Sequence, residues 1–160
     1  MRRSEGIVSR KRRTICAVLA LGLAMAVLAA RTPAGAAGAE AFVVIVNAGN
    51  PVSSVSGGQL SGLFLKKVTH WEGGLPAQPV DLSPDSPVRS SFSQQIHHKA
   101  TPAVKAYWQQ MIFSGREVPP PEKTSAKDVV AFVSANRGGV GYVPAGTPLG
   151  EGVKTLDVKP

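Results

Sequence analysis

The first 39 residues follow the order of a secretory signal peptide, and this decides how much of the chain is left to fold. A segment rich in Lys and Arg (residues 2–13) precedes an uncharged apolar run from Ile15 to Ala30, and a small-residue zone ends in Ala37-Gly38-Ala39. We predict cleavage after Ala39, with cleavage after Ala34-Gly35-Ala36 as the alternative. A membrane anchor is the competing interpretation, but the apolar run has about 16 residues, fewer than the roughly 20 that span a bilayer. We therefore expect a periplasmic or secreted protein with no membrane insertion after signal removal.

Removal of this segment changes what the composition implies. The whole chain has 18 Lys and Arg, 10 Asp and Glu, and net charge +8. Seven of the basic residues and one acidic residue lie in residues 1–39, which leaves 11 against nine, net +2. The positive charge therefore belongs to the targeting segment and does not indicate nucleic-acid binding. The single cysteine, Cys16, lies in the apolar run, so residues 40–160 must form one domain around an ordinary core, without disulfides.

Strand and helix signals alternate along residues 40–160. The apolar run Ala41–Val46 is typical of a strand covered on both faces, as in parallel sheets. Further strands are predicted at Pro79–Leu82, at Val140–Val143 and around Val153–Val158. The pattern predicts an α/β domain whose mixed or mostly parallel sheet is flanked by helices.

Four helices are predicted from their starting residues. Ser56 is expected to cap the first, and Ser86 to cap the second with Pro87 at the first helical position. Thr101 before Pro102 is expected to cap the third, and Ser125 with Asp128 resembles a capping box for the fourth. The third helix carries an apolar stripe at helical spacing, formed by Val104, Tyr107, Trp108, Met111 and Ile112.

The usual signatures of catalysis and of metal binding do not occur. The sequence has no G-x-S-x-G elbow, P-loop or dinucleotide-binding glycine pattern, so we expect neither an enzyme nor a cofactor. His97 and His98 are adjacent and point to different sides of a helix end, so we expect them to face solvent and not to bind a metal. Trp71, Tyr107 and Trp108 could form a binding platform, but core packing is the better explanation because two of them lie on the apolar stripe.

Serine-bearing loops before two helices suggest anion binding. Ser54 and Ser56 precede the first helix, and Ser86 precedes the second. A helix N-terminus offers unpaired N–H groups and partial positive charge to an oxyanion. The alternative is that each serine merely caps its helix.

Four segments in order resemble the substrate-binding proteins of phosphate ABC transporters. Residues Gln59–Trp71 are similar to that family's motif, which is roughly L-x-x-I-F-x-G-K-I-x-x-W. Val80–Phe92 resembles the strand, phosphate loop and helix that follow it, and Tyr107-Trp108 resembles part of the next helix. Gly138–Val143 is similar to the family's G-x-I-G-Y-V strand. The resemblance implies a type II periplasmic-binding fold, reduced to about one lobe, and a phosphate-like ligand delivered to an ABC permease.

The phosphate loop departs from the family pattern R-x-D-x-S-G-T-x-x-x-F. Ser86 falls on the serine, but Leu82 falls on the arginine and Val88 on the threonine. Arg89 could supply the missing charge from another angle. We therefore expect a non-enzymatic protein that binds phosphate or another small oxyanion weakly, with a permease or a second copy as partner. The alternative is an envelope interaction or accessory protein that keeps the fold without a ligand.

Lys66 is a further departure, because the resembling motif has glycine at this position. If the backbone there is left-handed, lysine costs roughly 1 kcal/mol that glycine avoids. The sequence therefore predicts that Lys66 is strained if its backbone is left-handed.

Overall fold

The computed structural model describes residues 39–160, which belong to one compact unit. The predicted signal peptide, apart from its last residue, lies outside these residues. Within the described range, no helix combines the length and the apolar character that a membrane crossing requires.

A four-stranded mixed sheet forms the centre of the domain, in the order β3-β6-β1-β7. Strand β1 (Phe42–Asn47) pairs antiparallel with β6 (Gly139–Pro144) and with β7 (Val153–Thr155). Strand β3 (Gln78–Pro79) is parallel to β6. The α/β class with a mixed sheet is thus confirmed. The apolar run does form a largely buried strand, but both of its neighbours are antiparallel.

The single strand predicted at residues 79–82 is in fact two strands with different partners. After β3, the Val80 N–H still donates to the Val140 carbonyl at 2.8 Å, but the next N–H, of Asp81, donates to Pro121 at 2.9 Å. Strand β4 (Asp81–Leu82) therefore pairs, in parallel, with β5 (Glu122–Lys123), which follows a proline-rich linker. The chain leaves the main sheet at this point and leads into the second helix.

The last predicted strand also divides. Strand β7 ends at Thr155, and β8 (Asp157–Lys159) pairs in parallel with β2 (Ser54–Ser56). Between them the buried Leu156 donates its N–H to the Val44 carbonyl of β1 at 2.9 Å. After Leu156 the chain leaves β1 and pairs with β2 instead.

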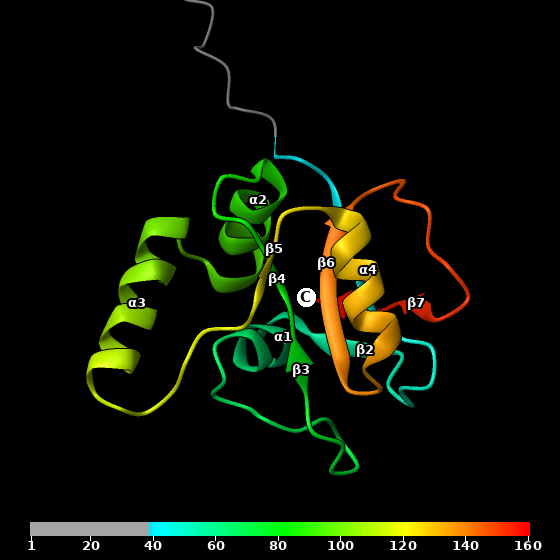
Figure 1. Cartoon of the computed structure of the whole chain (residues 1–160), viewed down its shortest axis with the longest axis horizontal. Helices are drawn as coiled ribbons and strands as arrows, with labels where there is room; N and C mark the ends of the chain where they lie inside the picture. Colours follow the sequence, from blue (N-terminus) through cyan, green and yellow to red (C-terminus); the bar gives the residue numbers. More distant parts are fainter. Residues whose placement is uncertain (1–38) are drawn as a thin grey trace, which may run out of the picture. The chain divides into compact units, whose positions relative to one another are not determined.

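Four helices surround the sheet, as Figure 1 shows. Helix α4 (Ala126–Ala135) lies along one side of β6, while α1 (Gly57–Phe64) and α2 (Pro87–His97) lie on the other. Helix α3 (Thr101–Phe113) stands beyond α2 at the edge of the domain. Ser56, Ser86 and Ser125 occupy the N-cap positions predicted for them.

The predicted start of α3 is wrong by one residue. Both Ala103 and Val104 donate their N–H groups to the Ala100 carbonyl, at 2.9 and 3.3 Å, so Ala100 is the N-cap. Thr101 is consequently the first helical residue and Pro102 the second, and no side chain caps this helix.

The main core fills the space between the sheet and its covering helices. Close packing of α4 on β6 explains Gly141, because a Cβ there would lie 2.6 Å from Val129 and 3.3 Å from Val133. Trp71 is buried in the same core and donates to the Gly138 carbonyl at 2.9 Å, as core packing predicts.

Helix α3 is held by a separate small cluster made of Leu65, Val104 and Trp108. The Tyr107 hydroxyl adds a hydrogen bond to the Leu65 carbonyl at 2.9 Å. The predicted apolar stripe is therefore confirmed over most of its length, but Ile112 at its end is 51% exposed. The stripe extends further than the cluster that covers it.

Lys66 has the left-handed backbone on which its predicted strain depended, with φ of 51°. It follows the C-cap Leu65, and the Lys66 and Lys67 N–H groups donate to Leu63 and Gly62 at 3.2 and 2.9 Å. These two bonds close a Schellman motif, in which glycine is usual at the position of Lys66.

Candidate functional site

The start of α2 is the first part of the candidate site. Strand β4 leads through a short turn, closed by the Ser86 N–H and the Ser83 carbonyl at 2.9 Å, into Ser86 as N-cap and Pro87 at the first helical turn. The Ser86 side chain is half-buried and makes no capping hydrogen bond. Pro87 has no N–H and the Ser90 N–H donates to the Ser86 carbonyl, so the Ser86 hydroxyl and the N–H groups of Val88 and Arg89 are what this turn can offer an anion.

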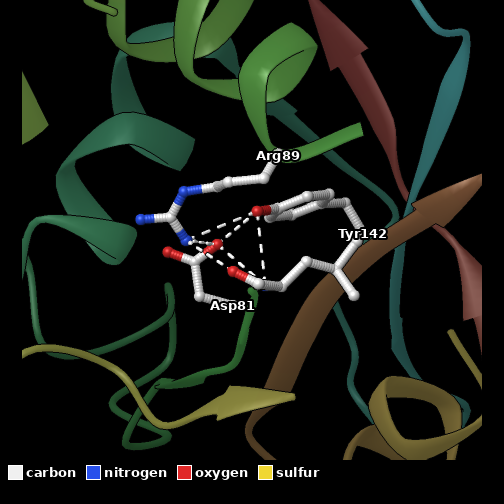
Figure 2. Close-up of polar contacts among 4 residues, drawn as sticks. Asp81, Arg89 and Tyr142 are labelled. Atoms are coloured by element: carbon white, nitrogen blue, oxygen red, sulfur yellow. Dashed lines mark hydrogen bonds and ion pairs between the residues drawn. The ribbon is translucent and has the colours of Figure 1, made fainter. Parts of the chain in front are cut away.

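Arg89, the third residue of α2, points inward and is 4% exposed. Its Nη1 forms an ion pair with Asp81 Oδ1 and approaches the Leu82 carbonyl at 3.3 Å and the Tyr142 hydroxyl at 3.5 Å. The Tyr142 hydroxyl also donates to Asp81 Oδ1. Figure 2 shows these side chains converging from α2, β4 and β6. The positive charge of Arg89 thus already has a partner inside the protein.

Burial sets the protonation states of this cluster. It lowers the pKa of Arg89 below its ordinary value, against the raising effect of Tyr142 and Glu122. It raises the pKa of Tyr142 well above its ordinary value, although Arg89 opposes this change. The phenol is therefore neutral and serves as a hydrogen-bond donor. The Arg89 Nε is also buried and has no partner among the described atoms, so the guanidinium is not fully satisfied.

The family-derived anion positions Leu82 and Val88 both lie in the hydrophobic core, each 3% exposed. Neither can be directed at a ligand without opening the domain. Leu82 contributes only its backbone, whose N–H lies 3.1 Å from Asp81 Oδ1. This part of the site therefore has no replacement for the family's arginine and threonine contacts.

The four candidate residues do not form one cluster. Ser86 and Arg89 share the first turn of α2, whereas Ser54 and Ser56 lie on β2, which Figure 1 shows well away from α2. Ser56 is also occupied, because it accepts from the Gln59 N–H at 3.2 Å while the Gln59 side chain accepts from the Ser56 N–H at 3.0 Å. This reciprocal capping box supports the alternative interpretation that Ser56 merely caps its helix.

An open depression of about 460 Å³ lies between the starts of α2 and α3. It is lined by Pro84 and Ser90 on the α2 side, and by Ala100, Thr101, Pro102 and Lys105 on the α3 side. Ser90 lies one helical turn after Ser86, and its N–H donates to the Ser86 carbonyl at 3.2 Å. The Thr101 Oγ1 is buried and has no partner among the described atoms. The depression therefore combines two helix starts and one lysine, while the Thr101 hydroxyl is turned away from solvent.

Sequence reasoning missed Asp81, Tyr142 and Lys105. A carboxylate inside an otherwise apolar strand was the available signal for Asp81, since a buried acid needs a cationic partner. Tyr142 lies 61 residues away, and only the folded chain brings the two together.

The prediction that both histidines face solvent is wrong for His97. This side chain is 7% exposed, and its Nδ1 lies 2.9 Å from the Ser61 hydroxyl on α1. Burial, followed by the positive charges of Arg89, His98 and Lys67, lowers its pKa to about 4. It was missed because α1 packs on the end of α2, a contact that local sequence does not encode. Within the described range, no group of His, Cys, Asp or Glu could hold a metal ion.

Known structures share this fold, although neither the protein-family models nor the curated proteins give a match to the sequence. A protein from Clostridium perfringens, assigned to the phosphate ABC transporter substrate-binding proteins and solved with bound phosphate, aligns with TM-score 0.59 and 18% identity. The alignment covers 74% of this chain and 45% of that chain.

Two further solved structures align with a similar share of the chain. An ABC-type phosphate transport receptor from Vibrio cholerae aligns with TM-score 0.57 and 21% identity, over 74% of this chain and 46% of that one. PstS from Borrelia burgdorferi aligns with TM-score 0.59 and 14% identity, over 75% and 47%. The chain thus has a binding-protein-like fold and spans less than half the length of these proteins.

Proposed function

We propose that this chain is an exported, non-enzymatic binding-protein domain that takes a small phosphate-like oxyanion weakly where α2 and α3 begin. One observation carries the proposal: Ser86 stands at a helix N-terminus with no capping bond, and Pro84 and Ser90, on either side of it in sequence, line a depression together with Lys105. The bound phosphate of the Clostridium perfringens neighbour is consistent with this class of ligand.

Weak binding follows from the charges around the site. Arg89 is the cation closest in sequence to Ser86, but Asp81 neutralises it and the pair is buried. Lys105 supplies a single ammonium group without the two-pronged geometry of a guanidinium. The described residues align with less than half of each neighbour, so they correspond to only part of such a binding protein. Together these features support a dissociation constant in the millimolar range, about 4 kcal/mol of binding.

Delivery to an ABC permease is part of this proposal, as is a periplasmic or secreted location. Both rest on the signal-like N-terminus and on the phosphate transport for which the neighbours are named. The alternative function is an envelope interaction protein that keeps the fold without a ligand. It is favoured by one observation, namely that large apolar side chains at the end of α3 are exposed.

The test is a titration of residues 39–160 with phosphate and with sulfate at constant ionic strength, followed by calorimetry and by thermal melting. A ligand at ten times its dissociation constant should add roughly 1.4 kcal/mol to the free energy of unfolding. Lys105→Gln should weaken binding, whereas the matched change Lys127→Gln, on α4, should not.

Two results would contradict the proposed weak binding. Micromolar, phosphate-selective binding by a monomer would indicate an ordinary transport receptor with stronger contacts than those described. No heat and no stabilisation at tens of millimolar anion would favour the interaction protein.

A further inference from the structure

Four large hydrophobic side chains are exposed among the described residues. They are Val68, Ile112, Phe113 and Val118, exposed by 43, 51, 90 and 60%. Three of them lie at the end of α3 or shortly after it, and Val68 lies in the segment that follows α1. The ion pair between Lys66 and Glu117, at 3.4 Å, joins the two segments. Val68 packs against α1 and lines a different pocket, so we call Ile112, Phe113 and Val118 the α3-end patch.

Positive charge borders this patch. From Lys99 to Arg116 the chain has three basic residues and no acidic residue. Glu117, the next residue, is paired with Lys66. Lys67 lies on the same side of the domain as α3, with its ammonium 5.9 Å from the centroid of the Tyr107 ring. No ion pair among residues 39–160 engages Lys67 or Arg116.

We propose that the α3-end patch docks on an anionic phospholipid surface. Phe113 and Ile112 enter the boundary between headgroups and acyl chains, while Arg116 and Lys67 contact lipid phosphates. Apolar and aromatic side chains beside basic residues are the combination that interfacial helices use, and each basic residue near an anionic leaflet adds to the attraction. Figure 1 shows α3 at the edge of the domain, where its outer side is not covered by another element.

A second copy of the chain fits this patch less well. A symmetric contact places the same surface on both partners, so Arg116 and Lys67 of two copies would meet like charges. The area is also small. Phe113 offers about 150–250 Å² and the other two side chains less each, whereas a stable dimer buries about 800 Å² per partner. A lipid surface requires neither self-complementarity nor that area.

This contact goes beyond the proposed oxyanion site and also beyond the expectation of no membrane insertion after signal removal. Only side chains enter the interface, which is compatible with the finding that no described helix is suited to cross a membrane. The two sites can be separated experimentally, because Phe113 and Arg116 do not line the depression at the starts of α2 and α3.

The experiment is co-sedimentation of residues 39–160, a unit with its own core, with vesicles of phosphatidylcholine alone or mixed with phosphatidylglycerol. We expect partition into the phosphatidylglycerol vesicles that falls as salt rises. Phe113→Ser should lower the partition coefficient about tenfold, and Phe113→Leu should largely preserve it. Because Phe113 is 90% exposed, neither change should alter the melting temperature appreciably.

The charge control is a matched pair. Arg116→Glu should lower partition, whereas Lys127→Glu, the corresponding change from an exposed basic residue to glutamate on α4, should leave it close to that of the parent. Lack of binding to either vesicle, or unchanged binding by Phe113→Ser, would overturn the proposal. A concentration-dependent dimer that Phe113→Ser dissolves, without vesicle binding, would assign the patch to a second copy instead.

Discussion

The buried ion pair of Asp81 and Arg89 provides the sharpest test of how this domain is held together. Asp81→Asn keeps the size of the side chain and removes its charge, which leaves Arg89 buried without a counter-charge. Both side chains are 5% exposed, so water cannot replace the lost partner. Breaking a buried pair in this way costs about 3–5 kcal/mol. For a domain of this size, that corresponds to a drop in melting temperature of roughly 10–20 °C.

The assay is urea unfolding of four proteins: the parent, Asp81→Asn, Arg89→Met and the double variant. We expect each single change to be strongly destabilising and the double change to cost far less than their sum, because it removes both charges together. Glu117→Gln is the comparison, since it breaks the partly exposed pair with Lys66 and should cost about 0–1 kcal/mol. A loss below about 1 kcal/mol for Asp81→Asn would refute the reasoning, since it would mean that Arg89 reaches water.

Two further predictions concern stability. Lys66→Gly should relieve the left-handed strain of about 1 kcal/mol, but it also removes the ion pair with Glu117, which offsets part of the gain. In a Glu117→Gln background, where that ion pair is already absent, the change should raise the melting temperature by a few degrees. An unchanged melting temperature there would show that the backbone is not strained. The pKa of His97 is about 4 in the folded protein and 6.5 in the reference state, so its contribution to stability is complete above pH 6.5, declines as the pH falls towards 4 and changes little below that. Unfolding free energy should therefore fall by about 2–3 kcal/mol across this window, and His97→Gln should remove that component; an identical pH profile in the variant would contradict the assignment.

Local sequence signals predicted the helix starts well. Ser56 and Ser125 were recognised as caps because a capping side chain contacts N–H groups only two or three positions away, and Ser86 was placed at the N-cap by the proline that follows it. The start of α3 was missed by one residue, since no side chain caps it and Pro102 is tolerated at the second position. The buried character of β1 was equally readable from its apolar run.

Features that depend on residues far away in the sequence could not be predicted from local sequence signals. The direction of the neighbours of β1 is decided by where β6 and β7 return in the fold, and an apolar run is compatible with either direction. The same holds for the site. Ser86 was placed from its own neighbourhood, whereas the neutralisation of Arg89 depends on Asp81 and on Tyr142 from another strand.

The most direct test of the central claim is a phosphate titration of ¹⁵N-labelled residues 39–160, followed through the backbone amide signals. We expect saturable, millimolar shifts confined to the first turns of α2 and α3, including Val88, Arg89 and Ala103, with little change around Ser54 and Ser56. The same titration of Lys105→Gln should give smaller shifts at the same amides. Shifts centred on Ser54 and Ser56, or no shifts at saturating phosphate, would contradict an oxyanion site at the start of α2.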